Sequence, residues 1–138
     1  MKPMYEAKAT ATGGRAGHVA TSDGLIDFDL SLPEGLGGPG GAKSNPEMLF
    51  AAGYSACFGS AIDFVAAQHK ATLTENRVTA TVGIGQREGG GFQLAVRLEV
   101  HLKGVSAEDA KKIVDEAHQV CPYSHATRNN VNVELAVV

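Results

Sequence analysis

The order of apolar patterns along the chain predicts an α+β fold with antiparallel strands. Short alternating segments come first, followed by a long apolar helix, two more alternating segments, a second helix and a last alternating segment. This order differs from the regular strand–helix alternation that builds a parallel sheet. The chain has 138 residues, of which 43% are hydrophobic and 20% charged, so we expect one domain with one core over residues 1–138.

Three short strands are predicted near the beginning of the chain. Residues 5–11 alternate small and polar side chains and stop at two glycines, which indicates an edge strand that enters a turn. Residues 18–22 and 26–30 are separated by an Asp-Gly dipeptide, which favours a tight hairpin. Residues 33–43 contain five glycines and indicate a surface loop.

The clearest helix start lies at residues 44–47. There Ser-Asn-Pro-Glu offers a capping residue, a proline near the first helical position and a glutamate in the first turn. Residues 48–62 carry no charge, so we expect this helix to be buried on nearly every face. The uncharged run is shorter than the roughly 20 residues of a bilayer span, which predicts a core helix rather than a membrane anchor. One small chain has difficulty covering such a helix, and we therefore expect an obligate homodimer in which two of these helices pack together.

The second half of the chain contains a hairpin, a helix and a strand. Residues 78–84 and 92–102 alternate with a period of two around a glycine turn, which predicts a hairpin with one packed and one wet face. Residues 106–121 carry apolar side chains at intervals of three and four, which predicts a helix that Pro122 ends. Residues 131–137 predict a final strand.

Charge and composition argue against several partners. Twelve Lys and Arg residues stand against 15 Asp and Glu, which gives a net charge of -3 without a basic run, so we expect no nucleic acid partner. Residues 1–12 lack the continuous apolar segment of a signal peptide. We therefore expect a cytoplasmic protein that does not bind membranes.

The two cysteines, Cys57 and Cys121, lie 64 positions apart. A permanent disulfide is not expected in a cytoplasmic protein, so the pair indicates either inert buried thiols or redox chemistry. Cys57 lies within the apolar helix, where a small hydrophobic side chain is the ordinary interpretation. Cys121 lies at a helix end, in a Cys-Pro-Tyr-Ser turn.

Two other interpretations of the cysteines are disfavoured. The Cys-Pro-Tyr-Ser turn is similar to the redox turn of the thioredoxin and glutaredoxin folds, but there the cysteine begins a helix, whereas Cys121 is predicted to end one. A proline interrupts the set of side chains that suggests a zinc site, and no Cys-x-x-Cys pair is present. That set is Cys57, His118, Cys121 and His125. We expect no metal.

Three segments resemble the organic hydroperoxide resistance proteins, a branch of the OsmC-like superfamily. They are GGR at 13–15, NPEMLFAAGYSACF at 45–58 and HQVCPYS at 118–124, and the resemblance covers essentially the whole chain. The residues at 50–54 are more similar to this branch than to the osmotically induced branch. The small departures, Ala16, His18 and His125, touch none of the matched catalytic positions.

The resemblance implies an OsmC-like fold, with antiparallel sheets packed around the central helix in an intertwined homodimer. It also implies a thiol peroxidase that reduces organic hydroperoxides to alcohols. Cys57 then matches the peroxidatic cysteine, Cys121 the resolving cysteine, Arg15 the activating arginine and Glu47 its carboxylate partner. A lipoylated protein is the implied reductant of the resulting disulfide, and no metal, haem or flavin is expected.

Elementary chemistry agrees with these roles. Burial in an apolar helix raises the pKa of a cysteine, and the reactive thiolate therefore needs a cation nearby. Arg15 would supply that charge, and Glu47 would fix the guanidinium through a bidentate pair. Glu47 and Cys57 are ten residues apart, about 15 Å along one helix. Either Arg15 spans much of this gap, or Arg15 and Glu47 of one chain serve Cys57 of the partner subunit, and we favour the second.

The residues expected to bind substrate are Phe50, Phe58, Ile62 and Tyr123. These apolar side chains suggest a pocket for alkyl or fatty acid hydroperoxides, although ordinary core packing is the alternative for some of them. A peroxidase of the osmotically induced branch is a second possible function. A third is a noncatalytic dimeric module that binds an apolar ligand and keeps its cysteines buried and inert.

Overall fold

The computed structural model describes all 138 residues, in two compact units formed by residues 1–49 and 50–138. Each unit contains its own three-stranded sheet. The α+β class is confirmed by the order of elements. The first long helix begins in one unit and continues into the other. The expectation of one domain over residues 1–138 stays a prediction.

The first unit holds the strands β1 (Ala9–Thr12), β2 (His18–Thr21) and β3 (Asp27–Asp29). They pair antiparallel in the order β1-β2-β3, so β1 is an edge strand, as expected, although it begins four residues later than predicted. The predicted hairpin between β2 and β3 is confirmed. Its turn is closed by the Asp23 carboxylate, which accepts a 2.6 Å hydrogen bond from the Thr21 hydroxyl.

The turn between β1 and β2 is a single 3-10 turn, η1 (Gly14–Ala16), and it carries Arg15. Its entry residue, Gly13, has a φ of 76°, a left-handed conformation that favours glycine. At Gly17, just after the turn, an added Cβ would lie 1.8 Å from the carbonyl oxygen of Thr12. The backbone around Arg15 therefore depends on residues without side chains. A second 3-10 turn, η2 (Glu34–Leu36), interrupts the predicted glycine loop.

The helix α1 extends over Pro46–Gln68 and begins where the sequence predicts. The Asn45 side chain caps it by accepting a 2.9 Å hydrogen bond from the Met48 N–H, and the proline occupies the first helical position. One face of the helix is buried, and that face consists of Tyr54, Phe58, Ala61, Ile62, Val65 and Ala66.

In the single chain α1 is buried on one side only, and its burial on nearly every face, which we expect from packing in a homodimer, stays a prediction. An exposed stripe follows the helix at intervals of four residues and consists of Met48, Ala52, Ala56, Ser60 and Phe64. By length and composition alone α1 would be able to cross a membrane, a property that it shares with the core helices of many soluble proteins. Its apolar residues are thus divided between a packed face and an uncovered one.

The second unit is built on the strands β4 (Glu75–Gln86), β5 (Phe92–Lys103) and β6 (Asn132–Val137). The strand order is β4-β5-β6, with β5 in the centre. β4 and β5 form the predicted antiparallel hairpin, but β6 pairs with β5 in parallel. The expectation of purely antiparallel pairing is wrong here, because a helical crossover between β5 and β6 returns the chain to the same end of the sheet.

That crossover consists of α2 (Ala107–Val120) and α3 (Pro122–Thr127). Ser106 caps α2 by accepting a hydrogen bond from the Asp109 N–H, as the sequence predicts. α2 ends before Pro122, also as predicted. The same proline occupies the first position of α3, where its missing N–H is not needed, and this short helix was not expected.

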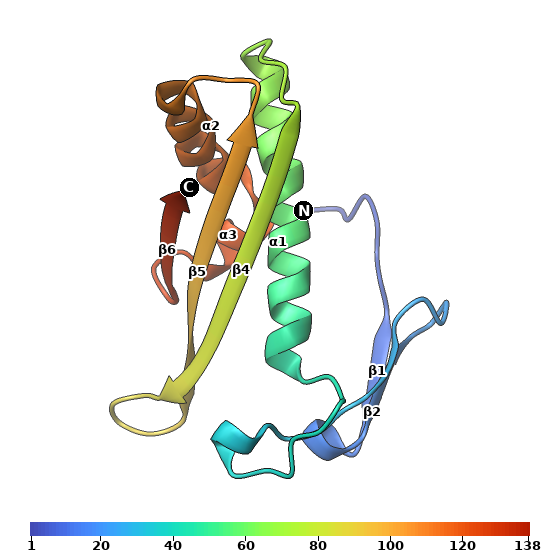
Figure 1. The fold of residues 1–138 in the computed structure, drawn as a ribbon. Helices are drawn as coiled ribbons and strands as arrows, with labels where there is room; N and C mark the ends of the chain where they lie inside the picture. The colour runs from blue at the N-terminus through green and yellow to red at the C-terminus, as the bar shows by residue number, and fades with distance from the viewer. The chain divides into compact units, whose positions relative to one another are not determined.

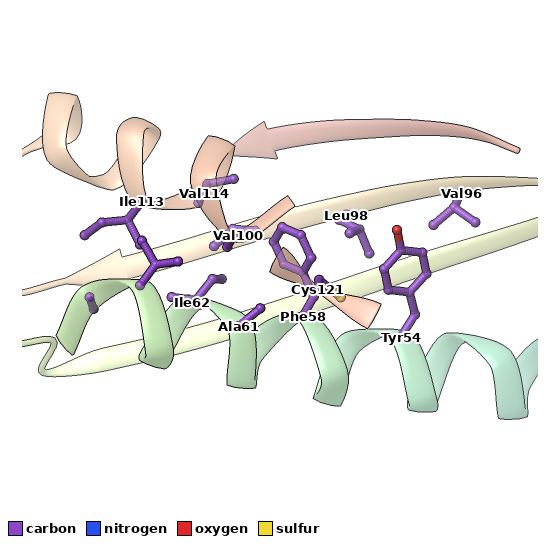
Figure 2. Close-up of a cluster of buried hydrophobic side chains, with 13 residues drawn as sticks. Tyr54, Phe58, Ala61, Ile62, Val96, Leu98, Val100, Ile113, Val114 and Cys121 are labelled. Atoms are coloured by element: carbon purple, nitrogen blue, oxygen red, sulfur yellow. The ribbon is translucent and has the colours of Figure 1, made fainter. Parts of the chain in front are cut away.

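The core lies between the helices and one face of the sheet (Figure 1). In Figure 2 the side chains of Tyr54, Phe58 and Ile62 project from α1 toward β5. β5 contributes alternate residues to the cluster, and α2 contributes Ile113, Val114 and Ala117. The remaining labelled members are Ala61, Val96, Leu98, Val100, Ile113, Val114 and Cys121.

Candidate active site

A bidentate ion pair joins Arg15 to Glu47, 32 residues apart in the sequence and both in the first unit. The guanidinium donates from Nη1 to Oε2 at 2.8 Å and from Nη2 to Oε1 at 2.6 Å. Glu47 lies in the first turn of α1, and its side chain is 12% exposed, whereas that of Arg15 is 37% exposed. The structure therefore brings together the two charged residues that the sequence assigned to the site.

Each partner stabilises the charge of the other. The hydrogen bond from Arg15 holds the pKa of the Glu47 carboxyl below its ordinary value, against the opposing effect of burial. The hydrogen bond to Glu47 raises the pKa of Arg15. Both groups are therefore ionised at neutral pH. A guanidinium has five N–H donors, and two of them are used in this pair, which leaves others for an additional acceptor.

The second pair that the sequence assigned to the site consists of the two thiols. Cys57 lies in the middle of α1, and Cys121 lies between α2 and α3, yet their sulfur atoms are 3.7 Å apart. Both thiols are free, Cys121 is fully buried and Cys57 is partly exposed. A disulfide needs about 2.05 Å between the sulfur atoms, so the pair lies within one small displacement of a bond.

The surroundings of Cys57 favour its protonated form. Burial raises the pKa of the thiol most, the backbone of Tyr123 lowers it, and the neighbouring Cys121 raises it again. Tyr123 is the second residue of α3, where backbone N–H groups have no intrahelical acceptor. Cys121 thus both ends one helix and begins another, which differs from the sequence-based view that it only ends one.

A cavity of about 400 Å³ opens beside Cys57. Two segments of the second unit line it: the middle of α1 and the junction between α2 and α3. The lining residues are Cys57, Ser60, Ala61, Phe64, Val120 and Pro122. Most of this surface is apolar, so the cavity suits an alkyl group better than a charged one.

The predicted substrate-binding residues do not line this cavity. Phe58 and Ile62 are fully buried in the hydrophobic core and lie outside the cavity, and their assignment to substrate binding stays a prediction. Phe50 and Tyr123 pack against each other, with ring centroids 6.1 Å apart. Tyr123 is 40% exposed, and Phe50 packs at the edge of the core.

The lining residues that the sequence analysis missed on α1 are Ser60, Ala61 and Phe64, and the largest of them is Phe64. A helical period would have identified it, because positions four and seven residues after Cys57 share its face, and these are Ala61 and Phe64. Phe58 and Ile62, at one and five residues, point elsewhere on the same helix. Hydrophobicity alone did not separate the two faces, since both are apolar.

No group of three or more His, Cys, Asp or Glu side chains is placed to hold a metal ion. His118, a member of the set considered for zinc, instead hydrogen bonds through Nδ1 to the Ser124 hydroxyl at 2.9 Å. The zinc interpretation therefore has no support from the geometry of these side chains.

Comparison with known proteins identifies the class to which this fold and site belong. Residues 38–136 match the protein family described as OsmC-like protein. Among curated proteins, the organic hydroperoxide resistance protein of Xanthomonas axonopodis pv. citri is 50% identical over 99% of this chain and 96% of its own length. OhrB of Bacillus subtilis is 44% identical over 96% of both chains. The chain belongs to the OsmC-like family and, within it, to the organic hydroperoxide resistance proteins.

Solved structures agree with this assignment. The crystal structure of an organic hydroperoxide resistance protein from Elizabethkingia anophelis, with thiocyanate bound, has a TM-score of 0.94 and 53% identity, and covers 99% of this chain and 98% of its own. A related protein from Vibrio cholerae has captopril bound in one of its active sites, with a TM-score of 0.93 and 49% identity over 99% of this chain and 94% of its own. The OsmC-like fold implied by the resemblance is therefore confirmed.

Proposed function

We propose that this protein is a thiol peroxidase that reduces organic hydroperoxides to alcohols. The observation that carries the proposal is the approach of two free thiols, 64 residues apart in sequence, to 3.7 Å beside an apolar cavity. Cysteines that only fill the core would need neither an apolar cavity beside them nor a second thiol within reach. The names of the relatives, which refer to organic hydroperoxide resistance, support the same assignment.

The reaction balances with these two thiols, a peroxide and an external dithiol. The Cys57 thiolate attacks the outer peroxide oxygen, an S–O bond forms, the O–O bond breaks, and the departing alkoxide takes up a proton to become an alcohol. The product at Cys57 is a sulfenic acid, which condenses with the Cys121 thiol to form a disulfide and water. A dithiol then reduces this disulfide through two exchange steps.

Arg15 provides the charge that the thiol pair lacks. Because burial raises the pKa of Cys57, the thiolate needs a neighbouring cation to form at neutral pH. An arginine cannot lose its proton, and its remaining N–H donors suit both the thiolate and the peroxide oxygens. Glu47 holds the guanidinium in one orientation through its two oxygens.

We propose that the functional unit is a homodimer in which Arg15 and Glu47 act on Cys57 of the partner subunit. Two observations support this arrangement. One is the exposed stripe on α1, and the other is that Glu47 and Cys57 are ten residues apart on one helix, a separation of about 15 Å. Mixed dimers of an Arg15→Ala subunit and a Cys57→Ser subunit test this arrangement. If the arginine acts across the dimer, they retain about half of the parent activity, because one site is intact. If it acts within one chain, they are inactive.

The reductant in this proposal is a lipoyl dithiol on a lipoylated protein. The cavity beside Cys57 is apolar, and a dihydrolipoyl arm is a flexible apolar dithiol of matching chemistry. The reaction would take place in the cytoplasm, where such dithiols remain reduced. Replacing dihydrolipoamide by glutathione is expected to slow turnover strongly.

The deciding experiment measures consumption of tert-butyl hydroperoxide and of hydrogen peroxide by the purified protein with dihydrolipoamide. The parent is expected to turn over the organic peroxide faster, and Cys57→Ser is expected to be inactive. Cys121→Ser is the matched cysteine variant and should consume about one equivalent of peroxide before stopping, because its sulfenic acid has no resolving thiol.

Two other functions predict different results. A noncatalytic module that binds an apolar ligand predicts no turnover and thiols that resist alkylation in the native protein. A peroxidase of the osmotically induced branch, which shares the chemistry, predicts no preference for the organic peroxide over hydrogen peroxide. Either result would overturn the proposal.

A further inference from the structure

The short helix α3 is stabilised by buried hydroxyl groups. Six residues are too few for a helix to persist in water without tertiary contacts. The buried residues of α3 are Ser124 and Thr127, which are 0% and 4% exposed, and both are polar. Buried hydroxyls destabilise a fold unless they are hydrogen bonded, so their partners determine where α3 lies.

These partners form a continuous chain of contacts that we call the hydroxyl cluster, comprising Tyr54, His118, Ser124 and Thr127. The fully buried Tyr54 hydroxyl lies 2.9 Å from Oγ of Ser124 and 3.2 Å from Oγ1 of Thr127. Nδ1 of His118 lies 2.9 Å from the same Oγ of Ser124. Oγ1 of Thr127 donates to the carbonyl oxygens of Tyr123 at 3.0 Å and of Ser124 at 3.1 Å. One serine oxygen therefore connects α1, α2 and α3.

The cluster lies next to both thiols along the chain. Tyr54 precedes Cys57 by three residues, so the two lie on adjacent turns of the same side of α1. His118 and Ser124 lie three residues before and after Cys121. Figure 2 shows the Tyr54 ring projecting from α1 into the part of the core that contains Cys121. The cluster thus links the turn of α1 that carries one thiol to the junction that carries the other.

The protons of the cluster can be counted. The Thr127 hydroxyl directs its one proton to the carbonyl oxygens of Tyr123 and Ser124, so its contact with Tyr54 uses the Tyr54 proton, and the contact of Tyr54 with Ser124 uses the Ser124 proton. No hydroxyl proton is left for the contact between Ser124 and His118, so Nδ1 of His118 donates to Ser124. Burial lowers the pKa of His118 most, and the nearby Arg128 lowers it further, so the ring is neutral at pH 7 and carries its proton on Nδ1.

We propose that the hydroxyl cluster positions Cys121 against Cys57 and thereby sets the rate of disulfide closure rather than the rate of peroxide attack. In that step the Sγ–Sγ bond forms, the S–O bond of the Cys57 sulfenic acid breaks, and the leaving hydroxide takes the Cys121 proton to become water. This inference rests on the proposed function. Tyr54, Ser124 and His118 are positioning residues in this step, since they act through the placement of Cys121.

The test separates the two steps in single-turnover experiments on the full-length protein. Tert-butyl hydroperoxide is mixed with the reduced protein, peroxide loss reports the first step, and trapping of the sulfenic acid by dimedone reports its lifetime before closure. In Tyr54→Phe and Ser124→Ala we expect closure to slow at least tenfold and the first step to stay within twofold of the parent. Tyr54→Phe removes a single oxygen, so it decides the matter if Ser124→Ala does not fold.

Substitutions of His118 distinguish a donor from a general structural role. His118→Asn retains an N–H donor near the position of Nδ1 and should restore closure to within threefold of the parent, whereas His118→Leu should be as slow as Ser124→Ala. His69→Asn is the matched control, because His69 Nε2 contacts Glu116 Oε2 at 2.7 Å and joins the end of α1 to α2 away from the thiols. It should leave both steps unchanged.

An equilibrium measurement keeps this inference separate from the proposed function. The disulfide is titrated with mixtures of reduced and oxidised dithiothreitol, which requires no peroxidase activity, and its equilibrium constant should fall about tenfold in Tyr54→Phe. Suppose that the parent consumes no peroxide and that the equilibrium constant still falls in Tyr54→Phe. This result would refute the proposed peroxidase function and retain the positioning role of the hydroxyl cluster. Two results would overturn the inference. In the first, the rate of disulfide closure and its equilibrium constant stay within twofold of the parent in both Tyr54→Phe and Ser124→Ala. In the second, these variants slow peroxide loss and disulfide closure equally.

Discussion

The charged pair and the thiol pair are built in opposite ways. Arg15 and Glu47 come from a glycine-supported turn and a helix start, are partly exposed and stabilise each other's ionised forms. Cys57 and Cys121 come from the interior of a helix and a helix junction, and burial favours the neutral form of Cys57. One region maintains charge and the other suppresses it.

The contrast indicates why a peroxidase would need both regions. A buried thiol beside an apolar cavity selects an alkyl substrate but is a weak nucleophile, because the thiolate is the reacting species. An exposed ion pair by itself selects nothing apolar. In the proposed function the charged pair activates the thiol and the cavity selects the substrate, so variants that weaken each region should fail in different ways.

Removal of the charge should have the largest effect. In Arg15→Ala we expect the rate constant for peroxide reduction to fall about 10²-fold or more, the size typical for loss of a group that stabilises developing charge. Alkylation of Cys57 by iodoacetamide at pH 7 should slow as well, because less thiolate is present. Stopped-flow peroxide consumption and mass spectrometry measure the two rates.

Arg97→Ala is the matched arginine variant, since Arg97 lies on the exposed face of the sheet and contacts Glu99. Its two rates should equal those of the parent. A fall in the peroxide rate with unchanged alkylation would mean that Arg15 acts on the substrate and not on the thiol.

Enlargement of the cavity should have a smaller and selective effect. In Phe64→Ala we expect kcat/KM for cumene hydroperoxide to fall about tenfold, as the loss of apolar contact in a substrate pocket does, while the value for hydrogen peroxide changes little. The exposed Phe92 at the start of β5 provides the control Phe92→Ala, for which no change is expected. Equal losses for both peroxides would place Phe64 outside substrate selection.

Acid should weaken the charged pair by a still smaller amount. Arg15 lowers the pKa of Glu47 below its ordinary value of 4.5, so the pair contributes stability above that pH and loses it as the pH falls through the lowered pKa. Because Arg15 is more than a third exposed, we expect a contribution below about 1 kcal/mol. Urea titrations should show that the free energy of unfolding of Glu47→Gln is lower than that of the parent at pH 7, and that the two values approach each other at low pH.

Glu134→Gln is the control for that comparison, because Glu134 is an exposed carboxylate on the sheet. The free energy of unfolding of Glu134→Gln should be close to that of the parent both at pH 7 and at low pH. A Glu47→Gln difference that persists unchanged in acid would show that the carboxylate contributes through something other than its charge.

Local signals in the sequence predicted most of the elements. The capping residues Asn45 and Ser106 begin their helices as expected, and Pro122 ends α2. Such signals act over three or four residues, so the sequence displays them directly. α3 was missed because its six residues are stabilised by distant partners, above all the Tyr54 hydroxyl, rather than by their own periodicity.

The amino-acid sequence by itself determined the α+β class, the helix starts and the residues that form the two pairs, because patterning, caps and the specific motifs are local properties of the chain. Only the tertiary structure decided the parallel pairing of β6, which depends on how the helical crossover returns to the sheet. It also decided which apolar residues of α1 face the core and which face the cavity. That choice depends on what packs against each side of the helix, and a uniformly apolar sequence carries no record of it.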